Sequence, residues 1–216
     1  MNPAEYDAWY DTPRGRWIGE TELALLQRLL NGKPGDSILD VGCGTGWFTR
    51  RLTTAGLTTT GLDPNPEWLA FARAQGGGER YIEGNALSLP FADASFDLVV
   101  SVTALCFVAD WPRALSQIVR IARRRFVLGL LNRHSLLYLQ KRRHGGSGAY
   151  QGAHWHTQDE VLEALASLPV ANVKVRTAVF LPSGSGLARA AENALPQTLP
   201  FGSFLAVSGE VLRKDQ

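Results

Sequence analysis

The sequence predicts an α/β fold in which one doubly wound sheet of about seven strands is mostly parallel, has an antiparallel last strand and carries helices on both faces. Short β-prone runs alternate with helical segments from residue 21 to residue 131. This alternation is typical of βαβ units, whose crossover helices cover both faces of a parallel sheet. Two further β-prone runs, 172–181 and 203–212, are connected too closely for another full crossover and predict a hairpin-like edge.

The predicted strands are short apolar or β-branched runs. The first, SILDV, has the nearly continuous apolar character expected of a buried parallel strand. In chain order the strands are expected at 37–41, 58–63, 80–84, 95–102, 125–131, 172–181 and 203–212.

The predicted helices follow from apolar spacing and end signals. Leucines at helical spacing over 21–30 predict a helix that ends at Asn31-Gly32. Asp110 or Trp111 is expected to cap a helix over 110–122, and TQDE at 157–160 fits a capping box before another helix. The remaining helices are expected near Gly46 and at 66–75.

Composition limits the function classes. Of the 216 residues, 45% are hydrophobic and 19% are charged, and the net charge is +2, an ordinary soluble mix. The two cysteines lack CxxC spacing, which disfavours a disulfide framework and a structural zinc site and fits a cytoplasmic protein. No signal peptide is expected at the N-terminus, and no apolar run approaches the roughly 20 residues of a membrane span.

The stretch ILDVGCGTGWFTRRL at 38–52 places Gly42, Gly44 and Gly46 directly behind an apolar strand. Glycine admits backbone angles closed to other residues and lets a ligand lie against the main chain. A dinucleotide fingerprint would place its third glycine at position 47, which here is Trp47. Asp40 at the strand end disfavours a pyrophosphate and favours a cationic ligand.

Four stretches in order resemble the class I S-adenosylmethionine-dependent methyltransferases. They are ILDVGCGTGWFT, GLDPNPEWLAFAR, EGNALSLPFADASFDLVVSV and DWPRALSQIVRIARRRFVLGLL, within residues 36–131. The chain looks closest to the small-molecule branch that includes ubiquinone and sterol methyltransferases (methyltransferase type 11). The resemblance implies a Rossmann-like fold, S-adenosyl-L-methionine as cofactor and S-adenosyl-L-homocysteine as product.

The resemblance also implies an organisation of the single domain 1–216. Residues 1–32 are expected to form a helical lid, 33–131 the cofactor-binding core, and 132–216 a substrate-side loop, helix and terminal strands.

Family roles are carried over only to matching positions. Asp40 is expected to face the methionine amino group, and Asp63 to accept hydrogen bonds from both ribose hydroxyls, because a carboxylate presents two acceptors in one plane. The matching positions are Asp40, Gly42, Cys43, Gly44, Thr45, Gly46, Asp63, Pro64, Asn85, Ala86, Leu87 and Thr103.

The residues expected to contact the adenine depart from the family pattern at one position. Asn85 stands where the family usually has aspartate, so its carbonyl oxygen would accept from the adenine amine without charge assistance. The backbone of Ala86 would meet a ring nitrogen. Leu87 is expected on the adenine face, with core packing as the alternative.

The aromatic N-terminal stretch YDAWYDTPRGRW is expected to act as a lid over the cofactor. Tyr6 and Tyr10 would shield the sulfonium, and Arg14 would pair with the methionine carboxylate, with Arg16 as a competitor. The alternative is a helix that merely packs against the sheet edge.

Methyl transfer from a sulfonium is an in-line displacement that mainly needs alignment, so a base matters only for a protonated acceptor. The candidate catalytic residues are Tyr10 and His134, which follows the fifth strand. His144, His154 and His156 lie further along the same region. We expect no metal, because no carboxylate or cysteine next to these histidines completes a ligand set.

The expected partner is a small-molecule methyl acceptor whose attacked atom is oxygen, nitrogen or carbon. SVTALCF after the fourth strand lacks the Asn/Asp-Pro-Pro-aromatic motif of nucleic-acid amine methyltransferases. Arg120 and Arg123–Arg125 could bind RNA, but we interpret them as a solvated helix end. A non-catalytic S-adenosylmethionine-binding module and a nicotinamide-dependent oxidoreductase are the alternatives. The sequence does not indicate an oligomeric state.

Overall fold

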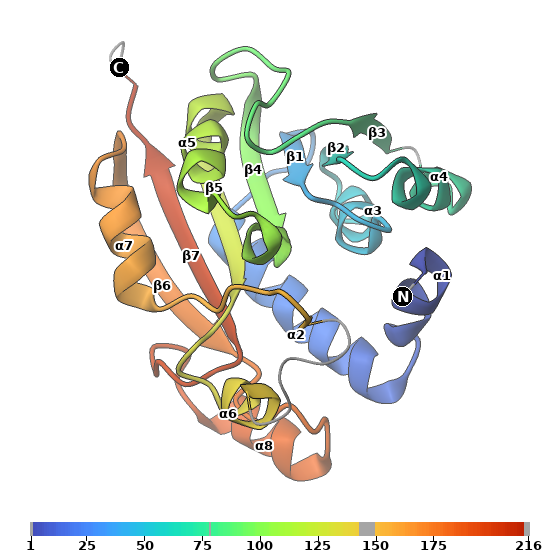
Figure 1. The fold of residues 1–216 in the computed structure, drawn as a ribbon, viewed down its shortest axis with the longest axis vertical. Coiled ribbons are helices and arrows are strands. Elements are labelled where there is room, and N and C mark those ends of the chain that lie inside the picture. Colours follow the sequence, from blue (N-terminus) through green and yellow to red (C-terminus); the bar gives the residue numbers. More distant parts are fainter. Residues whose placement is uncertain (1, 78, 143–149, 214–216) are drawn as a thin grey trace.

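The computed structural model describes residues 2–77, 79–142 and 150–213. Its centre is a seven-stranded sheet with the order β3-β2-β1-β4-β5-β7-β6 (Figure 1). The strands are β1 (Ser37–Val41), β2 (Thr58–Asp63), β3 (Arg80–Glu83), β4 (Phe96–Val102), β5 (Ala122–Leu131), β6 (Val170–Ala178) and β7 (Phe204–Val211).

The first five strands are parallel to one another, and β7 is antiparallel to both β5 and β6. The predicted sheet, mostly parallel with an antiparallel last strand, is therefore confirmed. The last strand is not at the edge, however, because β7 lies between β5 and β6.

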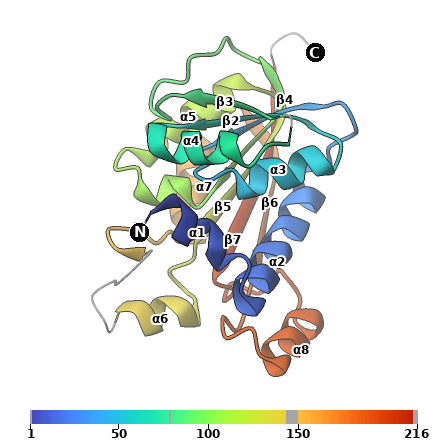
Figure 2. The same ribbon diagram turned by 90° about the vertical axis from the view of Figure 1, so that its right-hand side faces the viewer.

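Helices cover both faces of the sheet (Figure 2). Helices α2 and α3 share one apolar core with one face, and α5 and α7 share another core with the opposite face. The helices are α1 (Pro3–Trp9), α2 (Pro13–Leu30), α3 (Trp47–Thr54), α4 (Pro66–Ala74), α5 (Trp111–Ile121), α6 (Leu136–Arg142), α7 (Gln158–Ala166) and α8 (Gly186–Ala194), with a 3₁₀ helix η1 (Ala104–Phe107).

Several helices begin where a side chain caps the first turn by accepting a hydrogen bond from a backbone N–H. Asp110 caps α5 by accepting from the backbone N–H of Arg113, and Thr157 and Glu160 form the predicted capping box of α7. Helix α2 begins eight residues earlier than the leucine pattern predicts, at Pro13 rather than residue 21, because Thr12 caps it by accepting from Gly15 N–H.

The interpretation of Arg123–Arg125 as a helix end is wrong. Helix α5 ends at Ile121 and these arginines begin β5. Each pairs with a carboxylate of the protein: Arg123 with Asp97 at 2.8 Å, Arg124 with Asp36, and Arg125 with Glu210. They lie at the amino end of β5, whereas ligand sites in such sheets lie beyond the carboxyl ends.

Within the described residues, no helix is long and apolar enough to cross a membrane.

Candidate active site

The loop between β1 and α3 lies where the strand order reverses between β1 and β4. Gly42, Gly44 and Gly46 have φ values of 76°, 54° and 77°, in the left-handed region that favours glycine. A Cβ on Gly42 would lie 2.2 Å from the Cβ of Ala104, and one on Gly46 2.3 Å from the hydroxyl of Tyr81. Backbone conformation and space therefore both require glycine at these two positions.

Asp63, at the tip of β2, is joined to this loop. Its Oδ2 accepts from the N–H of Gly44 at 2.9 Å, and its Oδ1 accepts from the N–H of Asn65 at 2.9 Å. Burial raises the pKa of the Asp63 carboxyl. A carboxylate oxygen can accept two hydrogen bonds, so both oxygens can also receive hydroxyls of a ligand diol.

Asp40 lies beneath the loop and is almost fully buried. Its Oδ2 accepts from the hydroxyl of Thr49 at 2.7 Å. Burial raises the pKa of Asp40 to about 7. A cationic group placed beside Asp40 would favour its ionised form.

The carboxyl end of β4 forms the other wall of this reversal point. Ser101 donates from its hydroxyl to the carbonyl of Val41 at 2.8 Å, which joins β4 to β1. Thr103 follows with φ 56°, a conformation that is rare for a β-branched residue. Such strain is concentrated at functional sites, and here it turns the chain into η1 beside Gly42.

The residues after β2 and β3 form the adjoining rim. Pro64 is exposed next to Asp63, and Asn85 is exposed in the turn after β3. Oδ1 of Asn85 accepts from the N–H of Leu87 at 2.9 Å, so this oxygen already stabilises its own turn. Ala86 and Leu87 are partly buried and pack against the core under α5. Cys43 is partly buried, and burial raises the pKa of its thiol, which keeps it protonated.

Helix α1 packs beside α4 and is joined to the glycine loop (Figure 2). Arg50 pairs with Asp7 of α1 at 3.1 Å and donates to the carbonyl of Thr45 at 2.6 Å. The ring of Tyr6 lies 5.1 Å from that of Trp68, whose edge borders Gly44. The aromatic N-terminal segment therefore lies against the loop, as a lid would.

Tyr6 and Tyr10 are neutral phenols. Tyr10 is buried and stacks on Trp47, with ring centroids 4.2 Å apart. Burial raises the pKa of both phenols, that of Tyr10 strongly. At neutral pH each can donate or accept a hydrogen bond, but neither is a phenolate base.

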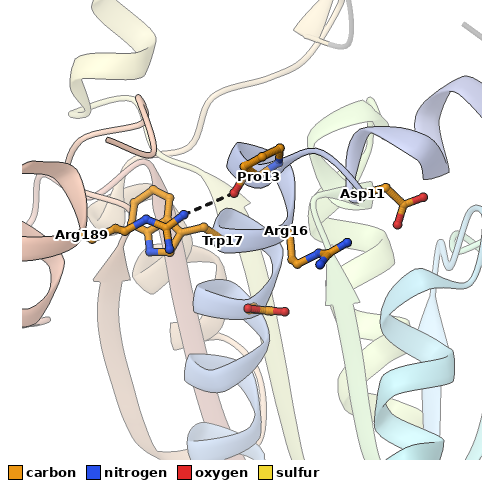
Figure 3. Close-up of a pocket in the computed structure, with 6 residues that line it drawn as sticks. Asp11, Pro13, Arg16, Trp17 and Arg189 are labelled. Atoms are coloured by element: carbon orange, nitrogen blue, oxygen red, sulfur yellow. Dashed lines mark hydrogen bonds between the residues drawn. The ribbon is translucent and has the colours of Figure 1, made fainter. Parts of the chain in front are cut away.

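Arg14 and Arg16 point to different surroundings. Nε of Arg14 donates to the carbonyl of Pro182 at 2.6 Å. Arg16 lines a surface hollow together with Asp11, Trp17 and Arg189, and Figure 3 shows its side chain extending from α2 into this region. The structure therefore does not place Arg16 at the glycine loop.

The described histidines are not equivalent. The side chain of His134 is exposed, and its backbone N–H donates to Oδ1 of Asn132 at 3.0 Å. His156 is fully buried, and Nε2 of His154 contacts Oε1 of Glu160 at 2.7 Å. His144 lies outside the described residues. The expectation that no carboxylate completes a set with His154 and His156 is wrong, because α7 brings Glu160 to them.

Sequence reasoning missed Glu22. It lies on α2 among the inward-facing residues Ile18, Leu25 and Leu26, and burial raises its pKa to about 8. When ionised, Glu22 raises the pKa of Tyr6, Tyr10 and Tyr150, so it lies close enough to these three phenols to interact with them electrostatically. A carboxylate within the leucine-rich helix predicted over 21–30 was the available signal, but the leucine spacing alone does not show which way Glu22 faces.

Glu22→Gln should stabilise the protein increasingly as the pH rises. The folded protein keeps the Glu22 proton up to about pH 8, whereas the ordinary value is 4.5. The folded state therefore binds more protons between these values, and this carboxyl makes stability fall as pH rises through them. We expect equal melting temperatures at pH 4.5, and a variant at least about 4 °C more stable at pH 8. Exposed Glu20→Gln is the control, and an equal difference at both pH values would contradict the prediction.

Comparisons with known proteins identify similar sequences and folds. A family model described as a methyltransferase domain matches residues 39–127. An uncharacterized protein of Mycobacterium tuberculosis is 34% identical over 95% of this chain and 70% of its own length. Malonyl-[acyl-carrier protein] O-methyltransferase of Pectobacterium atrosepticum is 42% identical over 50% of this chain. That alignment spans 41% of the enzyme's length, so the chain matches about two fifths of it.

Solved structures extend the similarity to almost the whole chain. An S-adenosylmethionine-dependent methyltransferase of Thermotoga maritima superposes with a TM-score of 0.77 at 25% identity, covering 97% of this chain and 96% of its own. Magnesium protoporphyrin IX methyltransferase of Synechocystis shares the fold, with a TM-score of 0.62 at 17% identity over 88% of this chain and 80% of its own.

Proposed function

Because this chain belongs to the class I S-adenosylmethionine-dependent methyltransferases, we propose that it transfers a methyl group from S-adenosylmethionine to oxygen, nitrogen or carbon of a small molecule. One observation carries the proposal. Gly42, Gly44 and Gly46 hold the loop at the sheet's reversal point in a left-handed backbone conformation, and Asp63 accepts a hydrogen bond from that same loop. Ala104 and Tyr81 pack directly against Gly42 and Gly46, so this close-packed loop keeps a fixed backbone shape against which a ligand can lie.

The residues present fit S-adenosylmethionine. Asp63 would accept from the ribose hydroxyls, and the buried Asp40 would favour the cationic methionine ammonium nearby. Ala86 and Leu87 would border the adenine, with Asn85 at its rim. When bound, this cofactor supplies an activated methyl group on a sulfonium.

The acceptor would lie near the N-terminal aromatic segment, close to Glu22, Tyr6, Tyr10 and Tyr150. Glu22 is largely protonated at neutral pH, so this group of side chains offers a carboxylic acid and three phenols, each able to donate and accept hydrogen bonds. Such groups suit a small polar acceptor. Exclusion of water by the lid would strengthen each of these hydrogen bonds. His134 remains the predicted base for an acceptor that loses a proton, and Tyr10 would orient the acceptor as a neutral donor.

The basic residues support a small molecule over RNA. Arg123, Arg124 and Arg125 each pair with a carboxylate of the protein, and Arg120 donates to the carbonyls of Leu89 and Phe91.

The proposal predicts micromolar binding of S-adenosylhomocysteine and turnover of methyl-labelled cofactor in a metabolite extract. Isothermal titration of the purified protein should show one site, and NADH should not compete. Labelled products should appear in the small-molecule fraction. Binding without any transfer would favour a non-catalytic module, whereas binding of NADH alone would overturn the family assignment of the site.

A further inference from the structure

The segment around His154 and His156 runs as a short extended piece beside the carboxyl end of β5. The N–H of His156 donates to the carbonyl of Leu131 at 2.8 Å, and the N–H of Arg133 donates to the carbonyl of His156 at 2.9 Å. Alternate side chains of an extended segment point to opposite sides. His154 and His156 therefore share one side, and Trp155 packs on the other with Tyr138 and Tyr150, ring centroids 5.4 and 5.5 Å away.

His156 is buried, and the surrounding protein does not satisfy the hydrogen-bonding capacity of its ring. Its exposed fraction is 0%, and neither ring nitrogen has a hydrogen-bond partner in the structure. Trp111 meets its ring edge-on, with centroids 4.9 Å apart. Buried polar groups are nearly always paired, because an unpaired one costs about 1–3 kcal/mol. In a neutral imidazole one of these nitrogens carries a free lone pair, which a metal ion can take as a ligand.

Two further donors face the same point. Glu160 begins α7, and one ligand atom from each of His154, His156 and Glu160 lies within 4.8 Å of the others. The ring centroids of His154 and His156 are 4.5 Å apart. His154 and Glu160 remain partly exposed, so an ion can reach the cluster from solvent.

We propose that His154, His156 and Glu160 bind one Zn²⁺ ion. Two imidazole nitrogens and one carboxylate oxygen form a common zinc ligand set, with a fourth position left for water. At metal–ligand distances near 2.0–2.1 Å, tetrahedral ligand atoms stand about 3.3 Å apart. To bind zinc, the contact of 2.7 Å between His154 and Glu160 would have to lengthen slightly. The widest separation between ligand atoms, which is at most 4.8 Å, would have to shorten.

The ion would join three parts of the fold. Glu160 fixes the start of α7, His156 lies against the end of β5, and Trp155 between the two histidines packs with Tyr150. Zinc would thus hold the acceptor-side segment in place without contacting the glycine loop. The site does not depend on the proposed methyl transfer.

Zinc titration of the full chain, made without a polyhistidine tag and stripped of metal with a chelator, tests the proposal. Competition with a chromophoric chelator should give one Zn²⁺ per chain. Bound Co²⁺ should show the intense visible absorption of a tetrahedral site, and zinc should raise the melting temperature.

Variants separate this cluster from other donors. His156→Ala and His154→Ala should weaken zinc binding at least about 100-fold, since each removes a ligand. Glu160→Gln keeps an amide that can serve the capping box, so it should lose zinc affinity with little change in metal-free stability. The exposed His134→Ala is the matched control and should bind zinc as the parent does. If His156→Ala fails to fold, the zinc affinities of His154→Ala and Glu160→Gln decide whether this cluster binds the ion. No zinc binding, or equal affinity in these variants and His134→Ala, would overturn the proposal.

Discussion

Asp63→Ala should weaken binding of S-adenosylhomocysteine at least about tenfold, because a hydrogen bond to a charged group is worth ~1.5–3 kcal/mol. The side chain has two roles. It would hold the ribose hydroxyls, and it accepts from the N–H groups of Gly44 and Asn65. Isothermal titration of parent and variant measures the loss.

A selectivity ratio separates these two roles. If Asp63 binds the diol, the parent should prefer adenosine over 2′,3′-dideoxyadenosine, and Asp63→Ala should lose that preference. If the substitution acts only by changing the loop, the affinities for both nucleosides should fall by the same factor. Asp93→Ala removes an exposed carboxylate paired with Arg120 and should leave both affinities unchanged. An Asp63→Ala protein that is folded and binds S-adenosylhomocysteine with unchanged affinity would refute the assignment.

Gly42→Ala should both destabilise the protein and abolish measurable binding of S-adenosylhomocysteine. The new Cβ would stand 2.2 Å from the Cβ of Ala104, at a φ of 76°. Left-handed strain and overpacking together should cost about 2–5 kcal/mol. For a chain of this size we expect a melting temperature lower by roughly 10 °C.

Two comparisons separate strain from collision at Gly42. Gly35 has a φ of 87°, but a Cβ there would meet nothing within 4 Å, so Gly35→Ala should show the strain alone, about 1 kcal/mol. Adding Ala104→Gly to Gly42→Ala removes the colliding atom and should recover part of the lost stability. If the double variant is no more stable than Gly42→Ala, the contact with Ala104 is not the cause.

The sequence predicted the sheet and the glycine loop well because both depend on local signals. SILDV followed by spaced glycines specifies a buried strand and an open turn within a few residues. The capping residue Asp110 and the box Thr157–Glu160 likewise act over three positions. These signals do not need the rest of the chain.

Features that depend on distant segments were not predictable. The early start of α2 is an exception, because the local cap Thr12 and Pro13 signal it and the leucine pattern alone does not. Strand β5 begins at Ala122 and not at residue 125 as expected. Its first arginines pair with Asp97, Asp36 and Glu210, which lie on other parts of the chain. The approach of Glu160 to His154 and His156 depends on how α7 docks. The burial of Glu22 depends likewise on tertiary packing.

The place of β7 between β5 and β6 affects the order of assembly during translation. β6 emerges from the ribosome before β7, which in the described part of the chain is its single neighbour in the sheet and follows after a 25-residue connection, 179–203. Until β7 emerges, β6 has α7 to pack against but lacks its strand partner, and the edge of β5 stays unpaired. Long-range pairing of this kind slows folding and leaves strand edges exposed to association. We therefore expect a ribosome-bound chain to be most prone to association with other chains after β6 has emerged and before β7 has paired with it.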